Sequence, residues 1–368
     1  MALRDFSRVR YLPLLAISIA EMRALQELSG MGKDELLPYM ALQPWGVSEA
    51  LENTLTRITA AYGDRPYIAD IAPARRPATG LRPVHHELQQ LRIPERGYAN
   101  WCSFVEERPS IIPTVQLGDL EQLPTQIGRL SRLGRGLAVY LQAPQFGIMG
   151  QLAAAIGAQT GGGADTVVIV DLGQQTAGRL ADQAIAAGFV RTMRQSMPLS
   201  AISLSASTFP SGFTGVDQQA IFERAHFDGV ANAVGADLLI YSDRGSARAE
   251  RQTGGGGAPA PRVDLAFNDH WTFFRDGDGD GDEPDDNGAE GDRIDAYIAQ
   301  ARRARRSNDW DNGLRIWATQ MIERTAGGDR NAIKSPMSST AVRINMHLHR
   351  QIHIDGGGLY DNDEEWSD

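Results

Sequence analysis

The chain has 368 residues, of which 42% are hydrophobic and 22% are charged, and its formal net charge is -10. This apolar content supports a sizeable core and excludes wholesale disorder, and the single cysteine, Cys102, excludes an internal disulfide framework and a cysteine-based zinc site. The longest apolar run, residues 11–20, is too short to cross a membrane, and residues 1–10 lack the features of a secretory signal, so we expect a cytoplasmic protein without a membrane partner.

The negative charge is concentrated in two segments, residues 276–292 and 355–368. They hold nine and six acidic residues, respectively, and neither contains a basic residue. The rest of the chain carries 31 acids against 36 Lys and Arg, a charge of about +5 that does not indicate nucleic-acid binding. We expect an acidic flexible loop at 276–292 and an acidic tail at 355–368.

Eight short apolar runs, each followed by a stretch with helical spacing, dominate residues 1–250. The runs are Tyr11–Ile17, Leu36–Leu42, Pro66–Ile71, Ile111–Leu117, Gly136–Gln142, Thr166–Leu172, Ala201–Ser205 and Asp237–Ser242. Several are continuous rather than alternating, which is typical of parallel strands that are buried on both faces. This order predicts an α/β fold with a (β/α)8 TIM-barrel-like domain over 1–250. An open doubly wound sheet is the alternative, although no G-x-G-x-x-G motif follows an early strand.

The strand–helix alternation stops after the eighth run, and residues 251–275 are predicted to form a Gly-rich tip and a hairpin. After the acidic loop, residues 293–354 are predicted to form a helical and extended C-terminal appendage packed on the barrel. The hairpin strands and the elements of the appendage are expected at Val263–Phe267, His270–Arg275, Arg293–Arg306, Asn312–Thr325 and Val342–His349. The third and fourth segments have helical spacing, and the others are short apolar or aromatic runs.

Polar residues end most of the predicted strands, where barrel enzymes carry their active residues. These positions are Gln43, Asp70, Gln116, Gln142, Asp171, Ser205, Ser207 and Asp243. The candidate catalytic residues are Asp70, Asp171 and Asp243, because paired carboxylates act as general acid and base or hold a hard cation. A divalent metal is the cofactor that such a site would use. The structural alternative is that these acids cap helices or tie loops.

Two features elsewhere have both a functional and a structural interpretation. On a strand, His347 and His349 would share one face and bind a metal together with His353, but histidines near a terminus more often lie at the surface. The Trp271 ring would stack on a ligand, but large aromatic side chains more often pack a loop.

Three stretches carry a family resemblance. They are Tyr11-Leu-Pro-Leu-Leu with Glu21, Ala24, Leu25 and Leu28; Ser207-Thr-Phe-Pro-Ser-Gly-Phe213 with Ile221, Glu223 and Arg224; and Ile240-Tyr-Ser-Asp-Arg-Gly-Ser246 with His270, Trp271 and Arg275. In order, spacing and total length they resemble the beta family of phage and prophage proteins, which is named after a satellite-phage gene product. Ser242 and Arg244 differ from the family pattern around Asp243, and Gln43 stands where that pattern has an acid.

The resemblance implies a barrel-like fold and a mobile-element setting, in which the satellite-phage protein is encoded beside a killing protein and counteracts it. Related proteins occur in bacterial gene clusters suspected of phage defence. Candidate binding residues lie at the strand ends and in the stretches quoted above: Gln116, Gln142, Ser207, Glu223, Arg224, Trp271 and Arg275.

Two functions of different classes follow. The first is a component of a phage-associated defence or toxin–antitoxin-like module that binds a companion protein from the same locus. The second is an enzyme, a metal-assisted, phosphodiesterase-like hydrolase that uses Asp70, Asp171 and Asp243.

Overall fold

Each of the eight apolar runs overlaps a strand in the structure, a computed structural model that describes residues 5–74, 80–249, 259–275 and 290–360. The strands are β1 (Leu14–Leu15), β2 (Tyr39–Leu42), β3 (Tyr67–Ile71), β4 (Ile111–Pro113), β5 (Leu137–Leu141), β6 (Thr166–Gln174), β7 (Ala201–Ser207) and β9 (Leu239–Tyr241). They pair in parallel as two four-stranded sheets, in the orders β1-β2-β3-β4 and β5-β6-β7-β9. The predicted α/β class with parallel strands is therefore confirmed.

The chain divides into two compact units and passes between them five times. Unit 1 consists of Met1–Ser18, Asp34–Ser207 and Glu223–Arg244. Unit 2 consists of Ile19–Lys33, Thr208–Phe222 and Gly245–Asp368. The boundary predicted after residue 250 lies close to the last of these five passages. Two short segments within the predicted range 1–250 therefore belong to the same unit as the C-terminal residues.

Single parallel bridges connect the two sheets of unit 1 at both of their edges. One bridge pairs Thr114, just after β4, with Ala138 of β5, and another pairs Tyr11, before β1, with Tyr241 of β9. Backbone hydrogen bonds extend these pairings, from Val115 N to Ala138 O (2.8 Å) and from Leu12 N to Tyr241 O (2.9 Å). One buried apolar cluster contains a residue from every one of the eight strands: Leu14, Tyr39, Ile68, Ile112, Ala138, Val167, Ala201 and Ile240. Alternate side chains of all these strands thus share one core.

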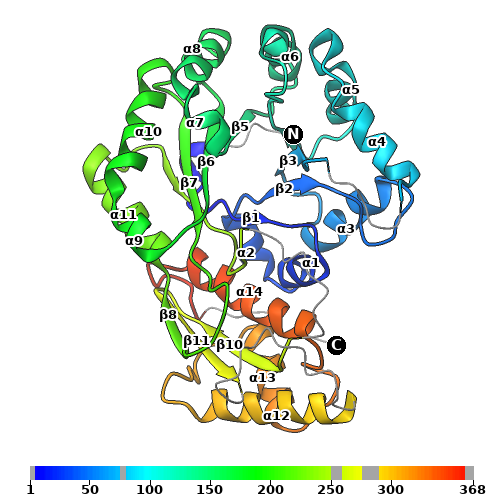
Figure 1. Cartoon of the computed structure of the whole chain (residues 1–368), viewed down its shortest axis with the longest axis vertical. Coiled ribbons are helices and arrows are strands. Elements are labelled where there is room, and N and C mark those ends of the chain that lie inside the picture. Colours follow the sequence, from blue (N-terminus) through cyan, green and yellow to red (C-terminus); the bar gives the residue numbers. More distant parts are fainter. Residues whose placement is uncertain (1–4, 75–79, 250–258, 276–289, 361–368) are drawn as a thin grey trace. The chain divides into compact units, whose positions relative to one another are not determined.

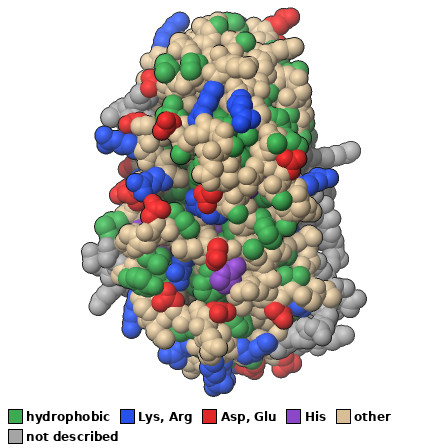
Figure 2. All heavy atoms as spheres, turned by 90° about the vertical axis from the view of Figure 1, so that its left-hand side faces the viewer, with side chains coloured by type: hydrophobic (Ala, Val, Ile, Leu, Met, Phe, Trp, Pro, Cys, Tyr) green, Lys and Arg blue, Asp and Glu red, His purple; other side chains and the backbone are tan. Residues whose placement is uncertain are grey.

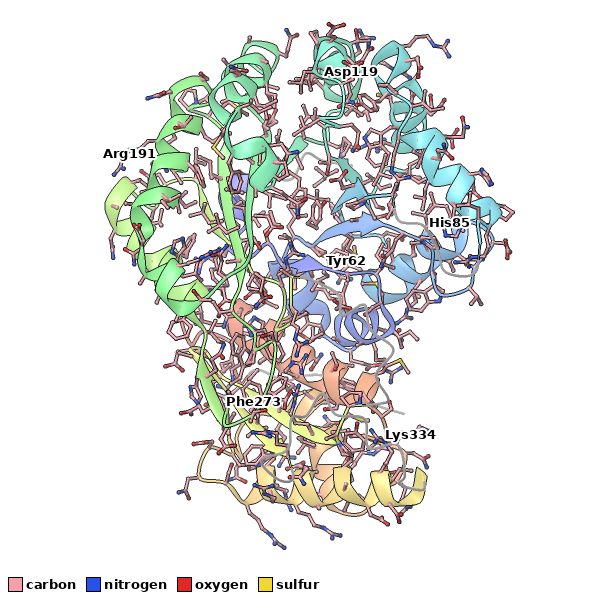
Figure 3. All side chains as sticks on the ribbon, viewed as in Figure 1. Tyr62, His85, Asp119, Arg191, Phe273 and Lys334 are labelled. Carbon is pink, nitrogen blue, oxygen red and sulfur yellow. The ribbon has the colours of Figure 1, made fainter. Side chains whose placement is uncertain are left out.

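The helices of unit 1 lie outside the strands (Figure 1). The helical segments are η1 (Phe6–Arg8), α3 (Glu52–Tyr62), α4 (Pro83–Leu91), α5 (Glu95–Glu106), η2 (Leu120–Gln122), α6 (Leu123–Ser131), α7 (Ala143–Phe146), α8 (Met149–Gln159), α9 (Ala177–Ala181), α10 (Gln183–Ser196) and α11 (Phe222–Val234). Buried side chains such as Tyr62 fix them to the strands. The Tyr62 hydroxyl donates a hydrogen bond to Leu36 O at 2.8 Å, close to the start of β2 (Figure 3).

We expect Gly157→Ala to destabilise the protein by about 1–3 kcal/mol, because α8 approaches the end of α10 closely at this position. A Cβ atom on Gly157 would lie 2.2 Å from Ser196 O, a backbone atom that cannot rotate away. This clash outweighs the gain of about 1 kcal/mol in helix propensity that alanine brings. Gly150→Ala in the same helix is the control, since its nearest neighbour would be Thr192 Cγ2 at 3.6 Å.

Urea unfolding of the two alanine variants measures both effects. The Gly157 variant should unfold at lower urea concentration than the wild type, and the Gly150 variant at an equal or higher one. Equal midpoints for the two variants would contradict the predicted clash.

Unit 2 contains an antiparallel sheet with the order β10-β11-β8. Its elements are α1 (Ile19–Gln26), α2 (Gly30–Glu35), β8 (Gln218–Ala220), β10 (Arg262–Ala266), β11 (His270–Arg275), α12 (Glu290–Arg306), α13 (Trp317–Ala326) and α14 (Pro336–Ile352). The predicted hairpin and the helix at Arg293–Arg306 are confirmed. The short run Val342–His349 is instead part of the helix α14. This helix begins at the N-cap Ser335, whose Oγ accepts a hydrogen bond from Ser338 N at 3.2 Å.

The core of unit 2 holds a buried charged triplet. The Asp264 carboxylate accepts hydrogen bonds from Arg262 Nε (2.6 Å) and Arg343 Nη1 (2.7 Å), and its side chain has 0% exposure. Each arginine also covers an aromatic ring, Arg262 that of Phe213 at 3.5 Å and Arg343 that of Phe209 at 4.2 Å from the ring centroid. Burial lowers the pKa of Arg343 to about 10, against the attraction of Asp264.

Parts of the segments predicted to be flexible lie outside the described residues, namely 250–258 in the Gly-rich tip, 276–289 in the acidic loop and 361–368 in the acidic tail. The helix α12 begins at Glu290, within the predicted loop 276–292. None of the helices within the described ranges is long and apolar enough to cross a membrane.

Candidate functional site

Asp70 lies on β3 at the carboxyl end of its sheet, as predicted, and three groups donate hydrogen bonds to it. They are Tyr39 Oη (2.8 Å), Gln116 Nε2 (2.7 Å) and Ile71 N (2.7 Å). Burial raises the pKa of Asp70, and the hydrogen bonds from Gln116, Ile71 and Tyr39 oppose this shift. Two candidate residues, Asp70 and Gln116, are therefore in direct contact.

Asp171 lies on β6 in the second sheet, and its side chain has 0% exposure. Its Oδ2 accepts hydrogen bonds from Tyr140 Oη (2.5 Å) and Gln142 Nε2 (3.3 Å) and forms an ion pair with Arg244 Nη2. Its Oδ1 accepts a bond from Gly173 N (3.0 Å). Both oxygens of this buried carboxylate thus accept hydrogen bonds.

The Asp70 and Asp171 groups are joined by two stacked tyrosines. The rings of Tyr39 and Tyr140 lie 4.6 Å apart between centroids, with an angle of 26° between their planes. Burial, with the nearby carboxylates, raises the pKa of both tyrosines, so their hydroxyls stay protonated at neutral pH and act as donors. We call this group the strand-end cluster: Tyr39, Asp70, Gln116, Tyr140, Gln142, Asp171 and Arg244.

Two serines of β7 face the strand-end cluster. Ser205 pairs directly with Asp171 in the β6–β7 ladder, and Ser203 pairs with Ile169 of the apolar core. Residues that pair in this way project to the same face of a sheet. The two serines are 1% and 0% exposed, and neither Oγ atom has a hydrogen-bond partner among the described residues.

Asp243, the third candidate acid, projects to the opposite face of its strand. It accepts hydrogen bonds from Tyr11 Oη (2.7 Å) and Tyr241 Oη (2.8 Å), whose rings stack at 5.6 Å. Successive residues of an extended chain alternate between faces, so Arg244, rather than Asp243, joins Asp171. The expected convergence of three acids is thus replaced by two acids and an arginine.

The other candidate residues of unit 1 lie at the end of β7 and on α11. Ser207 is the last residue of β7, and its carbonyl accepts a hydrogen bond from Gln175 N at 2.8 Å. Glu223 is buried at the start of α11, and the Arg224 guanidinium covers the Tyr241 ring at 3.4 Å from its centroid. Glu223 and Arg224 therefore lie on the Asp243 side of β9.

Trp271 and Arg275 lie on β11 in unit 2. Trp271 is 1% exposed, its Nε1 donates to Ser246 Oγ (2.8 Å), and its ring packs edge-on against Phe209. Figure 3 labels Phe273, which belongs to the same aromatic group. Arg275 lies 4.0 Å from Asp217 and is 7% exposed. Trp271 therefore belongs to the core of unit 2, as its structural interpretation expects.

Within the described residues, no group of three or more His, Cys, Asp or Glu side chains is arranged to hold a metal ion. His347 and His349 lie on the helix α14 rather than on a strand, so they do not share one face as predicted. The His349 Nε2 atom is 2.9 Å from Leu359 O.

Sequence reasoning missed Arg244, Tyr39 and Tyr140 as members of the site. Tyr140 precedes Gln142 by two residues and thus shares its face on β5, which is a signal that the sequence does contain. The ion pair of Arg244 with Asp171 could not be predicted in this way, because it depends on which side of the chain after β9 the Arg244 side chain occupies.

Comparisons with known proteins agree with the residues quoted for the family resemblance. The model of the Beta protein family matches residues 11–353. The chain is 28% identical over 371 residues to "Protein beta" of Enterobacteria phage P4, and the match covers 98% of each chain.

Two solved structures of the carboxyl transferase domain of Rhizobium etli pyruvate carboxylase are also similar to the chain. The one with pyruvate is 12% identical with a TM-score of 0.37, and the match covers 98% of this chain and 50% of that one. The one with pyruvate and biocytin is 10% identical with a TM-score of 0.38, with 97% and 49% covered. The chain thus spans about half the length of these two structures.

Proposed function

We propose, because the chain belongs to the Beta protein family, that it is a phage-associated protein that acts by binding a companion protein from the same locus. The observation that carries this proposal is the extent of the likeness to a phage protein, which covers nearly the whole of both chains. Both units of the fold therefore take part in the likeness.

For unit 1 we propose a closed (β/α)8 TIM-barrel-like architecture with β9 as its eighth strand. The bridges from Thr114 to Ala138 and from Tyr11 to Tyr241 support closure at both sheet edges. The apolar cluster that all eight strands share supports a common interior. In such a barrel the strand-end cluster would lie at the carboxyl-terminal mouth, where barrel proteins bind their ligands.

The surroundings of Asp171 favour binding over metal-assisted hydrolysis. Asp171 already forms an ion pair with Arg244, and that cation would repel a divalent metal at the same carboxylate. Asp70 is likewise occupied by donors from Tyr39 and Gln116. The hydrolase with Asp70, Asp171 and Asp243 therefore stays the alternative prediction, with less support than binding.

The face drawn in Figure 2 agrees with a protein partner better than with nucleic acid. On the face drawn in Figure 2, acidic and basic side chains are interspersed and hydrophobic side chains lie between them. Nucleic-acid sites instead gather basic side chains on one face. A companion made at the same phage or prophage locus would meet this protein in the bacterial cytoplasm. The family setting suggests that the complex restrains a killing protein in a defence or toxin–antitoxin-like module.

The test combines reconstitution with genetics. We expect the purified chain to form a complex with the product of one neighbouring gene, seen as a shared peak in size-exclusion chromatography. We also expect deletion of this gene from the native locus to change cell survival or phage plaquing. If no neighbouring product binds and deletion changes neither readout, the proposal fails.

The double variant Asp70→Asn, Asp171→Asn separates the two functions. If the protein works by binding, the folded variant should complement the deletion as the wild type does. If it is a hydrolase, the variant should behave like the deletion while it still folds and accumulates. Asp34→Asn is the matched control, because the Asp34 side chain is 63% exposed and lies in the same unit.

A further inference from the structure

Arg244 holds a buried hydrogen-bond donor that the fold leaves unused. Its Nη2 is paired with Asp171, whereas its Nε is buried and has no hydrogen-bond partner among the described residues. An N–H donor that is buried without an acceptor is costly, so such a group commonly marks a position that a ligand or a water fills. The Arg244 side chain keeps 19% of its surface exposed, which leaves a route to it from solvent.

Ser205 supplies a second unused group beside the first. It pairs with Asp171 in the ladder, its residue is 1% exposed, and its Oγ lacks a partner among the described residues. Ser203, two residues earlier on the same face, is in the same condition and lies nearer the apolar core. Ser205 on β7 and Arg244, which follows β9, thus both lie beside the Asp171 carboxylate, and each has an unused donor.

Asp171 is placed to orient Arg244 rather than to react. Donors from Tyr140, Gln142 and Gly173 saturate the carboxylate together with Arg244, so it has little capacity left for a further ligand. A carboxylate held in this way fixes the plane of the guanidinium and aims its remaining N–H groups.

The charges around this position are balanced. Asp171 is compensated by Arg244. Burial lowers the pKa of Arg92, and the attraction of Asp70 for its guanidinium opposes this shift. The two acids thus face two cations, so the net charge of this region does not repel an anionic ligand. A guanidinium edge is matched in shape by the oxygens of a carboxylate or a phosphate.

We propose that Arg244 and Ser205 bind an oxyanion group of a small ligand, a carboxylate or a phosphate, at the strand-end cluster. The stacked Tyr39–Tyr140 pair belongs to the same cluster, and Tyr140 Oη donates to the Asp171 carboxylate. Ser203 lies deeper and would bond the oxyanion or a water beneath it. This site goes beyond the binding of a companion protein and does not depend on it.

Isothermal titration calorimetry with the full chain tests the site, using sodium phosphate and sodium acetate as probes at constant ionic strength in chloride. We expect saturable binding of at least one probe, and the comparison of the two shows which oxyanion the site prefers. Arg244→Gln should weaken this binding at least tenfold. Ser205→Ala should weaken it several-fold while leaving the melting temperature of the free protein unchanged or raised, because it removes an unsatisfied hydroxyl.

Arg65→Gln is the matched control, since Arg65 in the same unit also pairs with an aspartate, Asp34, but lies away from the cluster. It should bind the probe as the wild type does. The proposal is overturned if neither probe binds saturably, or if Arg244→Gln and Ser205→Ala both bind with wild-type affinity. If Arg244→Gln does not fold, Ser205→Ala decides alone, and unchanged binding overturns the proposal. Because no companion is present, neither result bears on the complex proposed above.

Discussion

Asp264→Ala is expected to lower the free energy of unfolding by about 3–5 kcal/mol, because it leaves two cations in the core of unit 2 without their anion. Arg262 and Arg343 both donate to this carboxylate, and the Arg343 side chain is only 5% exposed. The rings of Phe213 and Phe209 attract the two guanidinium groups, but they do not replace a full negative charge.

Chemical unfolding of the Asp264 variant measures this loss. Asp329→Ala is the matched control, because Asp329 also pairs with an arginine, Arg324, at 2.8 Å, but their side chains are 28% and 40% exposed. Such a surface pair contributes about 0–1 kcal/mol. A loss below about 1 kcal/mol for Asp264→Ala would show that the triplet is not a buried ionic group.

Acidification is expected to destabilise the protein through His349. Burial lowers the pKa of His349 from 6.5 to about 4, and the hydrogen bond with Leu359 O opposes this shift. Between these two values the unfolded chain binds a proton that the folded chain does not. The stability that this group contributes is therefore complete above pH 6.5 and is lost as the pH falls towards 4, by about 3 kcal/mol in total.

His349→Gln isolates this contribution, because glutamine retains an N–H donor but does not titrate. The free energy of unfolding should depend less steeply on pH between 6.5 and 4 in the variant than in the wild type. Parallel wild-type and His349→Gln curves would refute the prediction.

The strands were predictable because each is a short run of mostly apolar residues. Runs such as Thr166–Leu172 and Gly136–Gln142 are apolar on both faces, as strands between a shared core and covering helices must be. The helix α14 was not recognised from Val342–His349. Apolar and polar residues alternate in this run, which is the period of a strand, and the start signals of the helix at Ser335 and Pro336 lie well before it.

The site was predictable only in part. Asp70 and Asp171 follow from the rule that strand ends carry polar groups, and the structure joins them through two tyrosines. Whether Asp243 or Arg244 faces Asp171 depends on which alternate residues of the eighth strand and its continuation point towards the Asp171 side. Both faces carry polar or aromatic residues, such as Ser242 on one and Tyr241 on the other, so the sequence pattern does not show which residues face Asp171.

The repeated passage of the chain between the units has a consequence for how the gene can change. Exchanging unit 2 alone between two alleles would need in-frame joints at all five passages, from 18/19 to 244/245. A single crossover would instead combine parts of two different cores within each unit, and closely packed interiors tolerate such mixtures poorly. Recombination should therefore pass this gene on as a whole, and its diversity should arise by point substitution rather than by the shuffling of modules.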